Sequence, residues 1–289
     1  MYGRIKSNAV LCLLLVMILV LAACGNQTET KTDANANNAA GSDTTTSTTA
    51  TAEKADLTIS AAASMTDALN EIKKDYETAH PNITLNFNFG GSGALQKQIE
   101  QGAPADLFLS AAVKNMTPLV EQKLIAEDKE KTLLKNELVA VVPADTKTSI
   151  GNMEDLKKAE VKKIAIGIPE SVPAGNYAKE ALTNSKLWEP LQPKVVQAKD
   201  VRQVLQYVET GNADAGFVYK TDALTSSKVK IAFTVDPVSY SAVEYPIGIV
   251  KATKHSQEAE DFYNYLQSQA SLDVFTKYGF TVPSLDQEK

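Results

Sequence analysis

The chain has 289 residues, of which 44% are hydrophobic and 22% charged, an ordinary composition for a soluble globular protein with one large or two modest domains. Its net charge of −6 at pH 7 excludes the general attraction to nucleic acid or anionic lipid that a basic surface provides. The only cysteines are Cys12 and Cys24, and this excludes a disulfide framework in the rest of the chain.

The first 23 residues have the pattern of a secretory leader. Arg4 and Lys6 precede an apolar run over 9–23 that is too short to assign as a spanning helix. Leu-Ala-Ala-Cys at 21–24 resembles the bacterial lipobox, in which the leader is cut before a cysteine that then carries lipid. The resemblance implies a signal peptide over 1–23, a lipid anchor on Cys24, and a location on the outer face of the cell membrane. Without Arg4 and Lys6 the chain keeps 27 basic and 35 acidic side chains, a net charge of about −8.

Residues 24–54 form a segment of distinct composition. After Cys24 it consists mainly of Asn, Thr, Ala, Ser and Asp, and it contains no aromatic residue and no Val, Ile or Leu. Such a segment cannot bury enough apolar surface to fold. We therefore predict a flexible tether between the anchor and the folded part.

Residues 57–69 predict a strand, a tight corner and the start of a helix. Leu57 and Ile59 alternate with polar residues as in a half-buried strand, and Ser64 stands at the expected N-cap of the helix. Such a corner presents free backbone N–H groups, a hydroxyl and the positive end of a helix dipole, which together suit an anion. Serine is also simply a favourable N-cap, so this corner alone leaves a purely structural role open.

The same arrangement recurs at the next strand. An alternating strand over 82–89 runs into Gly90-Gly91-Ser92-Gly93 and then into a helix that ends at Gly102. Neither phosphate-loop consensus is present, so a nucleotide site is not indicated. We expect the glycines to let the backbone approach a ligand closely, with Ser92 offering its hydroxyl and its N–H.

Two more corners follow. Pro173 suits the start of a helix, and we expect it to leave the amides of Ala174 and Gly175 unpaired. Asp200 caps the next helix, which leaves the N–H of Val201 free at its first position.

The remaining elements complete an alternation of strands and helices. The continuously apolar run at 138–143 is typical of a strand covered on both faces in a parallel sheet. The strand at 213–219 ends at Tyr219, and a buried tyrosine more often fills a core than contacts a ligand. Further strands are predicted at 105–110, 163–168, 195–197, 229–235 and 243–250, and further helices at 116–124, 257–266 and 271–278. The alternation predicts an α/β fold with sites at the carboxyl ends of strands.

The sequence shows no recognisable set of catalytic or metal-binding residues. His80 and His255 are the only histidines, and neither lies in a metal-binding or catalytic spacing. The acidic residues lie mostly on helix faces beside lysines, as on solvated surfaces. Serines and free amides without a base or a metal predict a binding site, no enzyme activity and no cofactor.

Seven segments together resemble one family, the molybdate-binding proteins of bacterial ABC importers. They are AAASMTDAL, GGSGALQKQI, GAPADLFLSA, PESVPAGNYAKEAL, AKDVRQVL, GFVYKTDA and EYPIGIV. The resemblance extends over 55–280 and implies a two-lobed type II periplasmic-binding fold. In this fold each lobe has a mixed, mostly parallel sheet flanked by helices, and two crossover strands join the lobes. The first lobe is expected over 55–137 plus 236–289 and the second over 138–235.

The resemblance also implies a set of oxyanion contacts. Ser64 and Ser92 are expected to give hydroxyl and amide, Ala174 and Val201 a backbone N–H each, and Tyr219 its hydroxyl, with no direct metal ligand. Met65 and Asn176 lie beside these positions in sequence and could tune selectivity.

A site made only of donors suits molybdate and tungstate, which carry no proton at neutral pH, and disfavours phosphate, whose P–OH would face another donor. Sulfate is unprotonated too, so its rejection must depend on its smaller size. We therefore expect extracytoplasmic capture of molybdate and tungstate by a monomer that closes on the anion and delivers it to a permease. A sulfate-binding lipoprotein and a lipid-tethered enzyme are the alternatives. We expect Ser92→Ala to weaken binding with little change in folding.

Overall fold

Residues 54–283, which the computed structural model describes, contain two five-stranded sheets. The predicted leader, Cys24 and the tether up to residue 53 lie outside the described residues. The first sheet has the strand order β2 (Ile83–Gly90), β1 (Ala55–Ala62), β3 (Leu107–Leu109), β10 (Val243–Val250) and β4 (Ile125–Asn136). The second has the order β7 (Val195–Ala198), β6 (Ile164–Gly167), β8 (Ala215–Tyr219), β5 (Leu138–Pro143) and β9 (Val229–Thr234).

Both sheets are mixed, with the same pattern of directions. In the first, β1 runs parallel to β2 and β3, and β10 runs antiparallel to β3 and β4. In the second, β6 runs parallel to β7 and β8, and β5 runs antiparallel to β8 and β9. The α/β fold with two mixed, mostly parallel sheets is confirmed, because only β10 opposes the other four strands of the first sheet and only β5 those of the second. The apolar run of β5 indicates burial on both faces of the sheet. Its pairing is antiparallel on both sides, and a central antiparallel strand can be covered on both faces as well.

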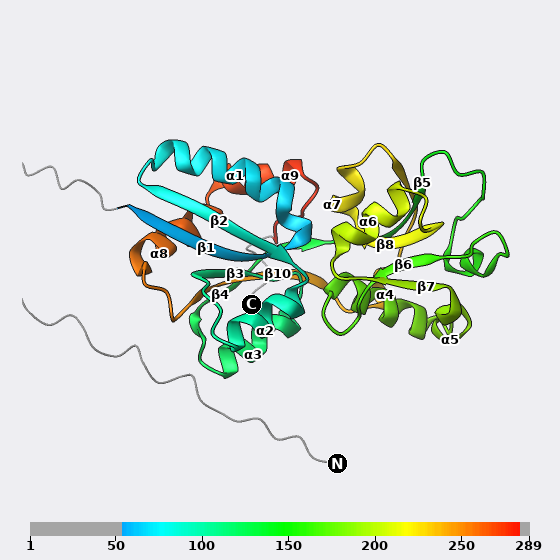
Figure 1. Ribbon diagram of the computed structural model, residues 1–289, viewed down its shortest axis with the longest axis horizontal. Helices are drawn as coiled ribbons and strands as arrows, with labels where there is room; N and C mark the ends of the chain where they lie inside the picture. Colours follow the sequence, from blue (N-terminus) through cyan, green and yellow to red (C-terminus); the bar gives the residue numbers. More distant parts are fainter. Residues whose placement is uncertain (1–53, 284–289) are drawn as a thin grey trace, which may run out of the picture. The chain divides into compact units, whose positions relative to one another are not determined.

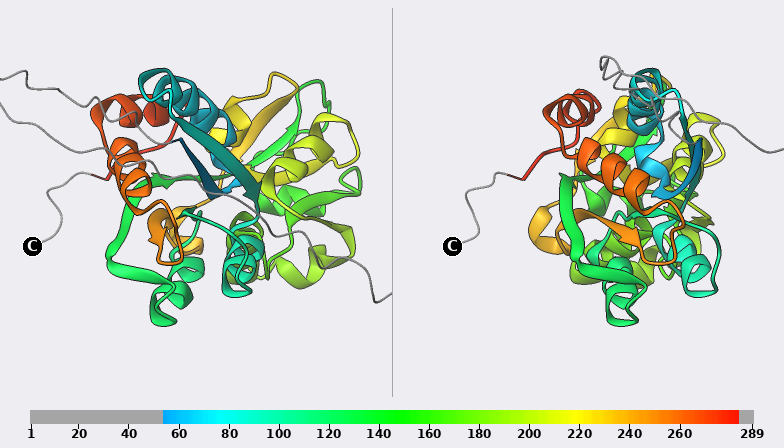
Figure 2. Two further views of the ribbon diagram at one scale, coloured as in Figure 1. Left: turned by 60° about the vertical axis from the view of Figure 1, so that its left-hand side comes forward. Right: turned by 90° about the vertical axis from the view of Figure 1, so that its left-hand side faces the viewer.

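Helices cover both faces of each sheet (Figure 1). Around the first sheet lie α1 (Thr66–Ala79), α2 (Ser92–Glu100), α3 (Val113–Glu121), α8 (Ser256–Leu266) and α9 (Gln269–Lys277). Around the second lie α4 (Pro173–Asn184), α5 (Trp188–Leu191), α6 (Val201–Glu209) and α7 (Lys220–Leu224). Short 3-10 turns are η1 (Ala63–Met65), η2 (Met153–Lys157), η3 (Gln192–Lys194) and η4 (Pro237–Ser239). The two C-terminal helices pack on the first sheet and its helix α1, beside the N-terminal strand (Figure 2).

The chain passes between the sheets twice, at Glu137 and over 235–242. We call the first sheet with its helices the first lobe and the second sheet with its helices the second lobe. The predicted lobe boundaries lie at these two passages, and a movement of one lobe against the other remains a proposal. All described residues belong to one compact unit. None of the helices within 54–283 is long and apolar enough to span a bilayer.

Helix α6 shows how the packing places a helix start at the edge of a sheet. Its buried face, which includes Val204 and Val208, packs on β8 and β6. Gly216 of β8 makes this close packing possible, because a Cβ there would lie 2.8 Å from a methyl group of Val208. The first residue of α6, Val201, is thereby held at the carboxyl end of β7.

Candidate anion-binding site

A small cavity lies where strand ends of the two lobes meet. All five predicted site residues line it, namely Ser64, Ser92, Ala174, Val201 and Tyr219. They come from five separate elements: η1, the first turns of α2, α4 and α6, and the end of β8. The lining also contains residues that the sequence did not single out as contacts: Ala62, Ala63, Gly90, Gly91, Ala111, Val172 and Pro173.

Ser64 lies in a 3-10 turn and not at the N-cap of α1. That helix begins at Thr66, and its N-cap is Met65, which makes no side-chain capping bond. The capping prediction is therefore wrong by one residue, because a 3-10 turn of small residues precedes the helix. The hydroxyl of Ser64 instead lies 2.9 Å from the hydroxyl of Tyr245, and both side chains are buried.

Ser92 is the first residue of α2 and is fully buried. Its Oγ accepts a hydrogen bond from the N–H of Ala111 at 2.9 Å. Because a backbone N–H can only donate, this bond leaves the hydroxyl proton of Ser92 available to an acceptor in the cavity.

The glycines around Ser92 serve the contact between the lobes. Gly93 donates its N–H to the carbonyl of Ser171 in the second lobe at 2.9 Å. A Cβ on Gly93 would lie 2.9 Å from Cα of Ser171, and one on Gly91 would lie 2.8 Å from its carbonyl oxygen. Gly91 and Gly93 therefore admit the backbone of the opposite lobe, and close approach of a ligand to the glycines of this turn stays a prediction.

The two corners of the second lobe each present the start of a helix. Helix α4 begins at Pro173, and Ala174 lies in its first turn, where the N–H has no intrahelical acceptor. Gly175 is not free as expected, since its N–H donates to the carbonyl of Val172 at 3.0 Å. Asp200 caps α6 as predicted by accepting the N–H of Gln203 at 2.8 Å, which places Val201 at the first helical position.

Tyr219 carries a buried polar atom without a partner. Its side chain is 1% exposed, and none of the described residues forms a hydrogen bond with its hydroxyl. The ring packs edge-on against Tyr245, with ring centroids 5.8 Å apart. Burial raises the pKa of Tyr219 well above its usual value, so the hydroxyl keeps its proton and acts as a donor. An unpaired buried hydroxyl is unfavourable, and an acceptor in the cavity would relieve this cost.

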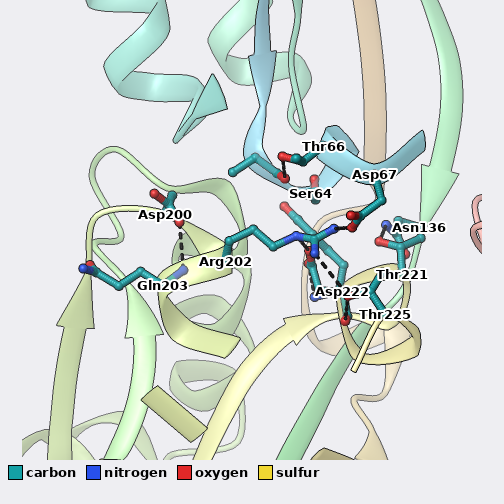
Figure 3. A network of polar contacts seen from close by, with 12 residues as sticks. Ser64, Thr66, Asp67, Asn136, Asp200, Arg202, Gln203, Thr221, Asp222 and Thr225 are labelled. Atoms are coloured by element: carbon teal, nitrogen blue, oxygen red, sulfur yellow. Dashed lines mark hydrogen bonds and ion pairs between the residues drawn. The ribbon is translucent and has the colours of Figure 1, made fainter. Parts of the chain in front are cut away.

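An ion-pair network joins residues that neighbour the cavity-lining residues in sequence (Figure 3). Arg202 follows Val201, and its Nη2 lies 2.5 Å from Oδ2 of Asp67, three residues after Ser64. Its Nε lies 2.8 Å from Oδ1 of Asp222, three residues after Tyr219. One guanidinium therefore connects the corner at Ser64, the corner at Val201 and the end of β8, and it contacts both lobes. The sequence alone did not single out Arg202, because its partners Asp67 and Asp222 belong to other elements of the fold.

The contact between Arg202 and Asp222 is close but poorly aligned. Neither Nε of Arg202 nor Oδ1 of Asp222 forms a hydrogen bond, so the contact is an ion pair only. Burial raises the pKa of Asp222 to about 6, although the charge of Arg202 opposes this shift.

The cavity lining offers hydroxyls and amides and contains no carboxylate or imidazole. In the part of the chain that the structure describes, no group of three His, Cys, Asp or Glu residues could hold a metal ion. Met65 and Asn176, expected beside the ligand, do not line the cavity; the amide of Asn176 donates to Glu180 instead. The arrangement can hold an anion through donors from both lobes.

Three comparisons relate the chain to known proteins. Residues 57–281 match the family described as bacterial extracellular solute-binding protein. YvgL of Bacillus subtilis, named as an ABC transporter substrate-binding lipoprotein, is 55% identical over 229 residues, which cover 79% of this chain and 87% of the relative. The molybdate-binding protein ModA of Haemophilus influenzae is 41% identical over 233 residues, covering 78% and 90%. A solved substrate-binding domain of a molybdenum ABC transporter from Clostridium difficile has 44% identity and a TM-score of 0.62, covering 79% and 99%.

Proposed function

Because the chain belongs to the bacterial extracellular solute-binding protein family, we propose that it captures molybdate outside the cytoplasm for an ABC importer. Proteins of this family bind solutes and are not enzymes. The observation that carries the proposal is the cavity that brings Ser64, Ser92, Ala174, Val201 and Tyr219 together, with the hydroxyl of Tyr219 buried and unpaired.

A doubly charged oxyanion leaves water only when donors replace its hydration shell. Ser64, Ser92 and Tyr219 supply hydroxyls, and Ala174 and Val201 supply amides at helix starts, where the dipole adds to the attraction. Each charge-assisted bond contributes roughly 1.5 to 3 kcal/mol, so several together hold a dianion. No lysine or arginine lines the cavity, so every hydrogen bond from the cavity lining to the anion would come from a neutral donor.

The donor set supports a choice among anions. Molybdate and tungstate carry no proton at neutral pH and meet every donor as acceptors, so we propose that both bind. Phosphate carries a P–OH, which would face a donor and find no acceptor. Sulfate is smaller and cannot reach all donors of the two lobes at once.

The wider setting is also a proposal. The lipobox-like segment supports a lipid anchor on Cys24, and the following segment a tether, on the outer face of the membrane. The chain would act as a monomer of two lobes, 55–137 with 236–289 and 138–235, that close on the anion. The closed form would be what the permease recognises.

A thermal-shift experiment with the full chain in detergent tests the proposal. Ligands that bind only the folded state raise the melting temperature in proportion to RT ln(1 + [L]/Kd). Molybdate and tungstate should raise it at concentrations where sulfate and phosphate do not. A shift with sulfate alone would replace the proposed ligand, and no shift with any of the four would remove the proposal.

A further inference from the structure

Asn136 at the end of β4 has an amide whose orientation is fixed by its backbone neighbour. Its Oδ1 accepts the N–H of Glu137 at 2.9 Å, and a backbone N–H can only donate. The Nδ2 group must therefore face the other way, toward Oγ1 of Thr221 at 2.9 Å (Figure 3). It also lies 3.2 Å from the hydroxyl of Tyr245. This amide group has only donors to offer to Tyr245.

The hydroxyl of Tyr245 is then left with one proton and one remaining partner. It accepts from Asn136, and its other hydrogen bond among the described residues is with Oγ of Ser64 at 2.9 Å. If Ser64 donated to Tyr245, the Tyr245 proton would stay unpaired in a fully buried position, which is unfavourable. The bonds therefore run in one direction, from Asn136 to Tyr245 and from Tyr245 to Ser64.

We propose that Asn136 and Tyr245 are positioning residues that hold the Ser64 hydroxyl as a donor toward the cavity. Because Tyr245 donates to Oγ of Ser64, the Ser64 proton is not used in that bond and can be given to a bound oxyanion. This inference rests on the proposed function and deepens it, because it names the residues that direct the Ser64 proton at the anion, where the proton of a P–OH group would oppose it. The Ser92 hydroxyl is also held as a donor, but by the backbone N–H of Ala111. Of the two serines, only Ser64 has its hydroxyl direction set by other side chains.

The test compares the affinities of molybdate and phosphate for the full chain in detergent at about pH 8, where both are dianions. Because the charges are equal, any general electrostatic change cancels in the affinity ratio. In Tyr245→Phe the Ser64 hydroxyl can rotate, so it donates less readily to molybdate and can accept from P–OH. We expect the molybdate-to-phosphate affinity ratio to fall roughly 10-fold, the size of one charged hydrogen bond.

Two further variants make the test specific. Tyr76→Phe is the matched control, since Tyr76 is a buried tyrosine of the same lobe that packs on Phe262 and Tyr265 and does not line the cavity. It should leave the ratio unchanged. Asn136→Leu removes the amide that donates to the Tyr245 hydroxyl, and it should also lower the molybdate-to-phosphate affinity ratio. This variant keeps the test valid if Tyr245→Phe does not fold.

The outcomes separate this inference from the proposed function. A wild-type chain that binds molybdate, together with variants whose two affinities fall by the same factor, overturns only the inference. A wild-type chain that prefers sulfate overturns the molybdate assignment, and the sulfate-to-phosphate ratio then decides the inference in the same way. A wild-type chain that binds phosphate best, or none of these anions, overturns both.

Discussion

At the scale of single residues, Tyr219 has a cost to stability that the proposed binding would offset. Its buried hydroxyl has no hydrogen-bond partner among the described residues. We predict that Tyr219→Phe raises the free energy of unfolding of the ligand-free protein by about 1 kcal/mol, because an unpaired polar group is removed. The same change should weaken molybdate binding roughly 10-fold, since a donor is lost. Denaturant unfolding and calorimetry measure the two effects, and an unchanged affinity would exclude Tyr219 from the site.

Substitution of Ser92 should weaken both molybdate binding and folding stability. Ser92→Ala should weaken molybdate binding roughly 10- to 100-fold by removing one charge-assisted bond. The structure corrects the expectation that folding is little affected, because the N–H of Ala111 would lose its acceptor inside the protein. We predict a loss of about 1 to 3 kcal/mol in the free energy of unfolding without ligand. Equal stability of variant and wild type in urea would show that the bond to Ala111 is unimportant.

Asp222 gives a prediction for pH. Burial raises its pKa from 3.8 to about 6. The charges around it act in opposite directions: Arg202 lowers its pKa, while Asp67 and Asp200 raise it. Between these two pH values the folded chain holds a proton that the unfolded chain has released, so this group's contribution to stability is lost as pH rises from about 4 to 6.

Comparison with Asp222→Asn isolates this contribution. The free energy of unfolding of the wild type, minus that of the variant, should fall by on the order of 2 kcal/mol over this pH interval and stay level above it. Urea titrations at several pH values measure the difference. A difference that increases with pH would mean that pairing with Arg202 outweighs burial.

At the scale of elements, local sequence patterns predicted most of the fold. Alternation and apolar runs placed β2, β5 and β10 within a residue or two, and Asp200 marked the start of α6 correctly. Strand β4 was missed because its sequence, IAEDKEKTLLKN, is rich in charge. That composition suits the edge position of β4 in the first sheet and conceals the alternation. Helix α3 begins at Val113, three residues before the predicted start.

The candidate site was predictable to the extent that it is made of strand-to-helix corners. The five cavity residues follow strand ends that local patterns reveal, and the resemblance to a family added Tyr219 to the set. What supports them was not predictable, because the partners are distant in sequence. Ser64 and Tyr245 are 181 residues apart, and Asp67 and Arg202 are 135 apart. No short pattern reports such contacts, and the close approach of Gly93 to Ser171 belongs to the same class.

At the scale of the whole molecule, the ion pair between Asp67 and Arg202 joins the two lobes beside the cavity. If closure holds the anion, loss of this pair should speed its release. We predict that Asp67→Asn raises the molybdate dissociation rate roughly 2- to 5-fold, the range of a partly exposed ion pair. A chase of radioactive molybdate with unlabelled molybdate measures the rate.

The sign of the effect separates closure from simple electrostatics. Removing a negative charge near an anion should by itself tighten binding. Glu71→Gln is the matched control, because Glu71 lies one turn further along α1 and pairs with Lys277 inside the first lobe. It removes the same charge and should leave dissociation unchanged. Slower release from Asp67→Asn would mean that the pair does not hold the lobes together.

The central claim is that one cavity between two lobes takes a molybdate-like dianion through neutral donors alone. Isothermal titration calorimetry of the full chain in detergent, at neutral pH, with molybdate, tungstate, sulfate and phosphate in turn, tests it most directly. We expect tight one-to-one binding of molybdate and tungstate and no comparable heat from the other two anions. Tight binding of phosphate or sulfate, or no binding of molybdate, would contradict it.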